Sequence, residues 1–319
     1  MMDYFLIIAG FILLIFGANF LVDGAVGVAR RYNVPNLVIG LTIVAFGTSA
    51  PELVVNLVAA LNPATTDIAL TNIIGSNTIN TYVILGAAAL VYPIKSQVIS
   101  RRFDIPMSLA AALAVLLLAW CFDDELSRID GIILLAVFSY FMYRTIRITM
   151  RAKNVTTDEK NESMKDTRKF WLYCVMIVGG LLMLVLGGQL IVNSATEIAE
   201  SLGISQAIIG LTIVALGTSL PELATSVVAA MKKNSDIALG NVIGSNIFNV
   251  FFVLGISSLV RPLPAYNNMA VDLGIAALGS LLVLVFVLTN KKYEIKRWEG
   301  GFLLGIYVVY LVWMISQTH

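Results

Sequence analysis

Two copies of one short string carry the side chains best suited to chemistry in this chain. The string GTSxPE occupies residues 47–52 and again 217–222, so that each copy ends in a glutamate, Glu52 or Glu222. Each copy lies in the middle of an apolar run, where a carboxylate is costly unless it meets a cation or a polar cavity. Small-residue helix packing would account for the Gly, Ser and Thr residues, but it leaves the two carboxylates unexplained. We therefore expect both glutamates to be functional.

The residues before each glutamate predict a break in the helix. Pro51 and Pro221 lack a backbone donor and clash with the carbonyl one turn back, and the glycines before them tolerate unusual dihedral angles. Unpaired backbone at membrane depth is tolerated only where it lines a cavity or meets another partner, such as a metal ion. The oxygen atoms expected to face the carboxylates are the carbonyls of Ala45, Thr48, Ala215 and Thr218 and the hydroxyls of Ser49 and Ser219.

A second string, GSNxxN, also occurs twice, at residues 75–80 and 244–249. Its serine and its last asparagine are four residues apart, which places them on one face of a helix. The side chains that could line the same cavity as the glutamates are Ser76, Asn80, Ser245 and Asn249. For the two serines, ordinary helix packing in a membrane is the alternative interpretation.

All the candidate ligands in these strings are oxygen atoms, and no Cys, His or basic residue accompanies them. Calcium takes about 6–8 oxygen ligands, magnesium gives up its water reluctantly, and softer metals prefer nitrogen or sulfur. Sodium is almost the size of calcium and also accepts oxygen. Two carboxylates can be neutralised by one calcium ion or by sodium ions that share the oxygens, so the two cations would compete for one site.

Composition places both strings in a membrane. The chain has 319 residues, of which 58% are hydrophobic and only 13% are charged. Its apolar runs are long enough to cross a bilayer, which takes about 20 helical residues. The alternating ten-residue segments of a β-barrel are absent. Ten helical spans are predicted, at residues 4–26, 36–60, 68–93, 105–122, 130–149, 170–194, 206–230, 237–262, 270–289 and 299–316.

The chain matches itself at an offset of about 170 residues, which indicates an internal repeat. Each half holds five spans, an odd number, so the second half must enter the membrane from the opposite side. Inverted repeats are typical of secondary transporters. The predicted fold is an all-α membrane protein with ten transmembrane helices in two inverted five-helix repeats whose core helices are broken. Its parts are a first repeat at 1–149, a charged cytoplasmic linker at 150–169 and a second repeat at 170–319.

Charge predicts the orientation and argues against some partners. Nearly all of the 21 Lys and Arg residues fall in alternate loops, so those loops and the linker should be cytoplasmic and both termini outside. We expect a multi-pass protein of the plasma (inner) membrane, surrounded by lipid and functional as a monomer. A net charge of +1 without a basic stripe argues against nucleic acid as a partner. Asp67 and Asp236 are expected to cap helices rather than to bind ions.

With two matched copies of GTSxPE and GSNxxN, the chain resembles the sodium/calcium exchanger branch of the calcium/cation antiporter superfamily, in its prokaryotic form. The resemblance covers nearly the whole chain. It implies an ion-binding core made by the second, third, seventh and eighth helices, across which the first and sixth slide or tilt. It also implies Ca²⁺ and Na⁺ as transported ions, no organic cofactor and no enzymatic activity.

The resemblance also implies a role for each candidate residue. Glu52 and Glu222 would ligate calcium together with the carbonyls of Thr48 and Thr218. The residues implied to line flanking sodium sites are Ala45, Ser49, Ser76, Ala215, Ser219 and Ser245, with Asn80 and Asn249 at the centre. Some family members, including potassium-dependent exchangers, carry Asp where this chain has Asn249. The resemblance therefore argues against potassium co-transport.

Three alternatives remain open at this point. A proton/calcium antiporter of the same fold is the nearest, because a buried glutamate can take up protons, although the hydroxyl-rich lining favours sodium. A cation channel would be expected to have a symmetric filter around a pore. An intramembrane enzyme that uses paired glutamates as acid and base lacks support, because the chain has no HExxH string and no Ser/His pair.

Overall fold

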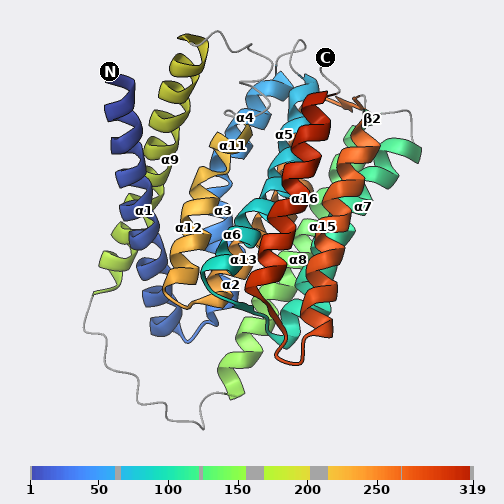
Figure 1. Cartoon of the computed structure of the whole chain (residues 1–319). Helices are drawn as coiled ribbons and strands as arrows, with labels where there is room; N and C mark the ends of the chain where they lie inside the picture. Colours follow the sequence, from blue (N-terminus) through green and yellow to red (C-terminus); the bar gives the residue numbers. More distant parts are fainter. Residues whose placement is uncertain are drawn as a thin grey trace.

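The computed structural model describes residues 2–61, 66–121, 125–155, 169–201, 215–266 and 268–316, and within them the chain is almost entirely helical. The long helices run roughly along one direction (Figure 1). Elements of the first half are α1 (Met2–Tyr32), α2 (Asn36–Ile39), η1 (Gly40–Val44), α3 (Ala45–Thr48), α4 (Ala50–Leu61), α5 (Thr66–Ile79), η3 (Asn80–Ile84), α6 (Leu85–Val91), β1 (Ile94–Lys95), η4 (Ser100–Asp104), α7 (Ile105–Cys121), β2 (Glu125–Leu126) and α8 (Arg128–Val155). Those of the second half are α9 (Phe170–Ser201), α11 (Ala215–Thr218), α12 (Leu220–Met231), α13 (Ser235–Phe248), η6 (Asn249–Leu254), α14 (Gly255–Val260), β3 (Leu263–Pro264), α15 (Met269–Thr289), β4 (Glu294–Ile295) and α16 (Arg297–Ser316).

Eight helices in the described part of the chain are long and apolar enough to cross a membrane. A ninth span is a bent pair, Asn36–Thr48 with Ala50–Leu61. The predicted span at 206–230 begins in residues outside the described ranges, and its described part consists of α11 and α12. An all-helical membrane fold with broken helices is thereby confirmed. The predicted linker at 150–169 begins as a continuation of α8, which ends at Val155, and most of the remainder lies outside the described residues.

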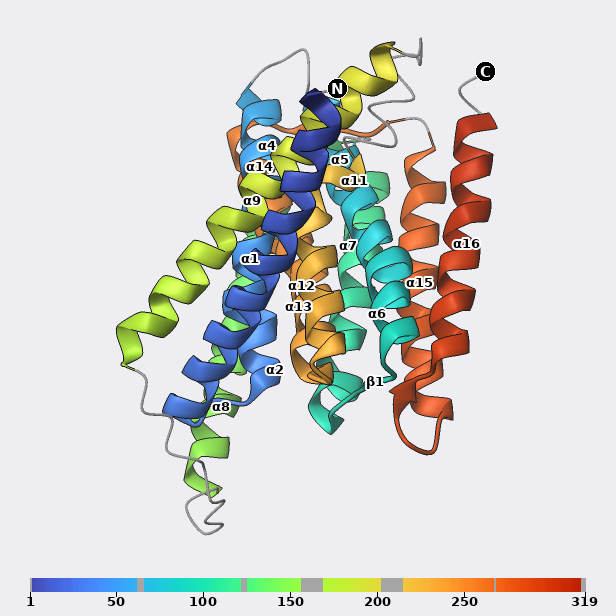
Figure 2. The same cartoon turned by 60° about the vertical axis from the view of Figure 1, so that its left-hand side comes forward.

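The first spans of the two halves lie side by side and run in opposite directions (Figures 1 and 2). Gly10 of α1 approaches Gly187 of α9, while Gly17 approaches Gly180. Residue numbers therefore rise along one helix as they fall along the other. The first span of each half crosses the bundle in the opposite sense, as inverted repeats require.

Four two-residue strands depart from the all-α prediction. Strand β1 pairs with β4, and β2 pairs with β3, both antiparallel. Each pair joins a loop of the first half to a loop of the second, because loops that run side by side satisfy their backbone groups by pairing them. The two small sheets thus tie the halves together.

The chain ends lie on one side of the helix assembly. The N-terminal end of α1 and the C-terminal end of α16 are at the top of Figure 1, whereas the C-terminal end of α8 and the start of α9 are at the bottom. The start of α1 and the end of α16 therefore lie on the side opposite the helix ends that flank the predicted linker.

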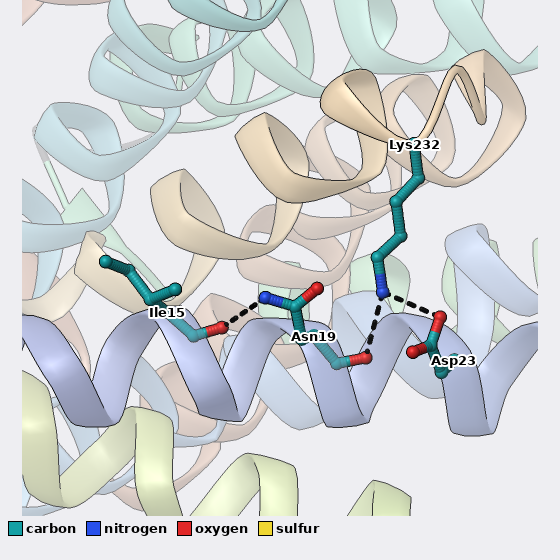
Figure 3. A network of polar contacts seen from close by, with 4 residues as sticks. All are labelled: Ile15, Asn19, Asp23 and Lys232. Atoms are coloured by element: carbon teal, nitrogen blue, oxygen red, sulfur yellow. Dashed lines mark hydrogen bonds and ion pairs between the residues drawn. The ribbon is translucent and has the colours of Figure 1, made fainter.

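An ion pair joins the first helix to the second half. The Nζ atom of Lys232, which follows the last residue of α12, lies 2.6 Å from Oδ1 of Asp23 on α1 (Figure 3). The same ammonium group donates to the carbonyl of Asn19 at 3.4 Å. These contacts hold α1 against the end of α12.

The expected helix cap at Asp236 is wrong. Helix α13 begins one residue earlier, at Ser235, and Asn234 is its cap, accepting a hydrogen bond from the Ile237 N–H at 3.2 Å. Asp236 therefore lies inside the first turn, where its carboxylate accepts from Nε2 of Gln97 at 2.7 Å. The side chain of Asp67 lies outside the described part of the structure.

The close approach of α1 and α9 leads to a prediction with a control one residue away. A Cβ atom at position 180 would lie 2.7 Å from the Gly17 carbonyl oxygen, whereas one at position 179 would meet nothing within 4 Å. Gly180→Ala should therefore lower the free energy of unfolding by about 1–3 kcal/mol, the usual cost of overpacking. Gly179→Ala should leave it nearly unchanged. Thermal unfolding of the detergent-purified variants measures both, and an equal loss at the two positions would contradict the packing described.

Candidate ion-binding site

Each half contains a helix break at the predicted string. In the first half, Asn36–Thr48 and Ala50–Leu61 meet at an angle of 46°. Ser49 between them has φ −84° and ψ 7°, and the equivalent Ser219 has φ −90° and ψ 4°. Since Pro51 has no N–H, the carbonyl of Gly47 one turn back has no helical donor. The sequence therefore breaks both helices at the same place in the repeat.

The two glutamates lie just beyond these breaks and are fully buried. Glu52 is in the first turn of α4 and Glu222 in the first turn of α12, and both side chains are 0% exposed. The N-terminal end of a helix carries a partial positive charge that favours a carboxylate. Each break thus positions a glutamate and supplies part of the field that stabilises it.

Hydroxyl groups connect the two carboxylates across the halves. Ser49 Oγ donates to Glu222 Oε1 at 3.0 Å, so a residue of the first break contacts the carboxylate of the second. Ser76 Oγ donates to Glu52 Oε1 at 3.3 Å and lies 3.1 Å from Ser219 Oγ. The remaining hydroxyl contacts are those of Thr218 with Glu52 and of Thr48 with Glu222. Both GTSxPE strings and Ser76 therefore meet in one cluster at the interface of the repeats, and Asn249 of the second GSNxxN string joins it by donating to Ser76 Oγ at 3.4 Å.

Five buried oxygen atoms of the described residues predicted to line the site have no hydrogen-bond partner. They are Glu52 Oε2, Glu222 Oε2, Asn80 Oδ1, Asn249 Oδ1 and Ser245 Oγ. A buried polar atom left unpaired is costly, so these oxygens need a partner from outside the protein. Carboxylate, amide and hydroxyl oxygens are the ligands of hard cations. No group of three or more His, Cys, Asp or Glu side chains that could hold a metal ion occurs among the described residues, so the carboxylates of this site number two and its other oxygens are neutral.

Both site asparagines lie where an α-helix changes to a π-helix. Asn80 begins the π-helical stretch η3 and Asn249 begins η6. A third such stretch, η1, ends immediately before Ala45. Short π-helical segments occur frequently at functional sites. These segments could not be predicted from the sequence, because i→i+5 bonds over about five residues leave no periodic pattern.

The two breaks differ in one predicted feature. The carbonyl of Ala45, expected to be free, accepts from the Ser49 N–H at 3.0 Å and from the Thr48 hydroxyl at 3.3 Å. In the second half, the Ser219 N–H donates to Leu216 instead, at 3.2 Å, so it does not occupy the carbonyl of Ala215. The chain bends only after Ser49 has closed its turn, which explains why the Ala45 carbonyl stays paired.

Sequence reasoning missed three asparagines near the site. Asn241 accepts from the Thr48 hydroxyl at 3.1 Å and donates to the Glu222 carbonyl at 3.3 Å, so it joins the two breaks. Asn77 and Asn246, the middle residues of the GSNxxN strings, bond to the amides of Asn249 and Asn80. All three lie in strings that occur twice, and this repetition was the available signal.

Comparison with known proteins agrees with this geometry. The family described as "Sodium/calcium exchanger protein" matches residues 2–147 and 172–316, which cover nearly all of both halves. The sodium/calcium exchanger MaX1 of Methanosarcina acetivorans is 33% identical, with 97% of each chain covered. The inner membrane protein YrbG of Escherichia coli is 34% identical, with 96% of this chain and 94% of YrbG covered.

A solved structure has the same fold. The sodium-calcium exchanger NCX_Mj, soaked with zero Na⁺ and Ca²⁺, superposes with a TM-score of 0.82 at 34% sequence identity, and the match covers 98% of both chains. The family model and this solved structure both match the chain over its two halves. The chain belongs to the sodium/calcium exchanger family.

Proposed function

We propose that this chain exchanges sodium for calcium across the plasma (inner) membrane by alternating access, without potassium. Membership of the family already makes it a cation/calcium exchanger and not an enzyme. One observation carries the finer proposal: Glu52 and Glu222, from opposite halves, are both fully buried, and each keeps one oxygen without a partner. A divalent cation between them would neutralise both charges.

The oxygen set supports competition between calcium and sodium. One calcium ion satisfies two carboxylates together with neighbouring carbonyls and amides, and sodium ions of nearly the same size can share the same oxygens. The proposed ligands of calcium are Glu52, Glu222, Thr48 and Thr218. Those proposed for sodium are Ala45, Ser49, Ser76, Ala215, Ser219 and Ser245, with Asn80 and Asn249 at the centre. Because the carbonyl of Ala45 already accepts two hydrogen bonds, it ligates sodium in this proposal by sharing its lone pairs with the ion.

The orientation follows from the basic residues. Arg30 and Arg31 lie in the last turn of α1, and Lys232 and Lys233 follow α12, on the side of the bundle where α8 ends. Loops rich in Lys and Arg stay in the cytoplasm, so this side is cytoplasmic and both termini are outside. The monomer is the functional unit in this proposal, because one chain supplies the whole cluster.

Two other functions would use the same site differently. Proton/calcium exchange draws support from the complete burial of both carboxylates, since burial favours the protonated form. Sodium is preferred because hydroxyl groups already surround the carboxylates. A channel would need a continuous path for ions, which two fully buried carboxylates do not favour.

Calcium-45 uptake into proteoliposomes distinguishes these functions. We expect uptake under an imposed sodium gradient and little under a proton gradient or with no gradient. Glu52→Gln and Glu222→Gln should each reduce sodium-driven uptake by more than the roughly 10–100-fold that the loss of an outer partner costs. Uptake driven by protons would favour the proton exchanger, and uptake without a counter-ion gradient would favour a channel.

Glu299 provides a matched control for these variants. It is a buried glutamate, 3% exposed, whose Oε2 accepts from the Lys296 N–H at 2.7 Å at the start of α16. Glu299→Gln keeps an acceptor oxygen and should leave sodium-driven uptake close to that of the unmodified chain. If Glu52→Gln and Glu222→Gln together behaved like Glu299→Gln, the proposed site would be wrong.

The bonds of Asn241 give a second prediction. Asn241 joins Thr48 to the Glu222 backbone and donates to Ser226 Oγ at 2.9 Å. Asn241→Ala should therefore raise the KM for calcium by about 10–100-fold, as expected when an outer partner of a ligand is lost. Glu299→Gln, the control above, should leave the KM nearly unchanged. An unchanged KM in Asn241→Ala would mean that Asn241 does not position the ligands.

A further inference from the structure

Two hydrogen bonds cross between the repeats in a reciprocal pattern. Nδ2 of Asn80 donates to Oδ1 of Asn246 at 3.1 Å, and Nδ2 of Asn249 donates to Oδ1 of Asn77 at 3.1 Å. Each bond joins the last asparagine of one GSNxxN string to the middle asparagine of the other. The same contact is therefore made twice, once in each direction across the interface.

The middle asparagines are held in place by bonds of their own. Nδ2 of Asn77 donates to the backbone carbonyl of Asn246 at 3.1 Å. Nδ2 of Asn246 donates to Thr81 Oγ1 at 2.9 Å and to Ser108 Oγ at 3.5 Å. Since their nitrogens are engaged as donors, their oxygens are left to accept from Asn80 and Asn249. Asn77 and Asn246 are buried, at 8% and 2% exposed, so water does not compete for these bonds.

This contact, together with a bond from Asn249 Nδ2 to Ser76 Oγ at 3.4 Å, fixes which end of each site amide is free. An asparagine side chain has an acceptor oxygen at one end and a donor NH₂ group at the other. With Nδ2 held, Oδ1 of both Asn80 and Asn249 is buried and has no hydrogen-bond partner. A half-turn of either amide would replace that oxygen with NH₂, whose partial positive charge repels a cation.

We propose that Asn77 and Asn246 are positioning residues that make the site selective for cations by fixing the amides of Asn249 and Asn80 with their oxygens toward the ion. This inference rests on the proposed function, in which Asn80 and Asn249 are ligands. Neither Asn77 nor Asn246 ligates the ion. The inference explains why each GSNxxN string carries a polar residue at its middle position.

A double-mutant cycle separates this role from simple packing, because aspartate presents oxygen whichever way it rotates. Asn246→Ala alone should raise the KM for calcium by about 10–100-fold, the usual loss for an outer-shell partner. In an Asn80→Asp background, the same change should alter KM by no more than about two-fold, close to the accuracy with which independent effects add. In an Asn249→Asp background it should retain its full effect.

The mirror cycle is the internal control. Asn77→Ala should lose its effect in the Asn249→Asp background and keep it in the Asn80→Asp background. A purely structural role for Asn77 and Asn246 predicts the same change in KM in all backgrounds, and that result would overturn the inference. If Asn80→Asp suppressed the effect of Asn77→Ala, or Asn249→Asp suppressed that of Asn246→Ala, the proposed pairing of asparagines would be wrong.

The readouts also separate this inference from the proposed function. The gradient that drives uptake in the unmodified chain tests the function, whereas the ratios of KM test the orientation of the amides under whichever gradient drives uptake. Calcium-dependent thermal stabilisation of the purified variants gives the same ratios without transport, because a bound ion stabilises only the folded state. Should an alanine variant fail to fold, Asn77→Ser and Asn246→Ser enter the same cycles, and unchanged ratios across the backgrounds would again reject the proposal.

Discussion

The structure depends on holding two carboxylates, those of Glu52 and Glu222, together and away from water. Burial of like charges is strongly unfavourable unless each gains hydrogen bonds and an opposite charge. The helix breaks, the first-turn positions and the cross-repeat bonds of Ser49 and Ser76 all supply part of that compensation. Five buried oxygens of the predicted site residues remain unpaired. In the proposed function, a cation is the partner that completes the cluster.

The inverted repeat is the means by which one chain surrounds such a site. Each half brings a broken helix and an asparagine-rich helix to the same interface from opposite sides of the membrane. Asn241 contacts the first half through Thr48 and donates to Ser226 within its own half, as Asn72 donates to Asn56 within the first half. Each half thus joins its broken helix to its asparagine-rich helix by an equivalent side-chain hydrogen bond.

The features that could be predicted from the sequence are those that occur in both repeats and those that depend on the residues of one helix alone. The membrane helices, the breaks at Pro51 and Pro221 and the burial of both glutamates follow from apolar runs, from proline chemistry and from the cost of intramembrane charge. The parts it missed depend on partners in the other half. Asn246 meets Asn80 only when the two halves pack together, and Asp236 lies in the first turn of α13 and accepts from Gln97 because the helix begins at Ser235.

Coupling follows from the same cluster, if the proposed function holds. A state without a cation leaves one oxygen of each carboxylate and the oxygen of each site amide unpaired inside the protein, and every such atom raises the energy of that state. Passage between the two sides is then favoured only when calcium or sodium fills the site. Fixing the amide oxygens of Asn80 and Asn249 strengthens this effect, because an amide free to rotate could turn its NH₂ group toward the carboxylates and stabilise the empty site. The fixed orientation of these two amides therefore favours obligatory exchange as well as tight binding of the ion.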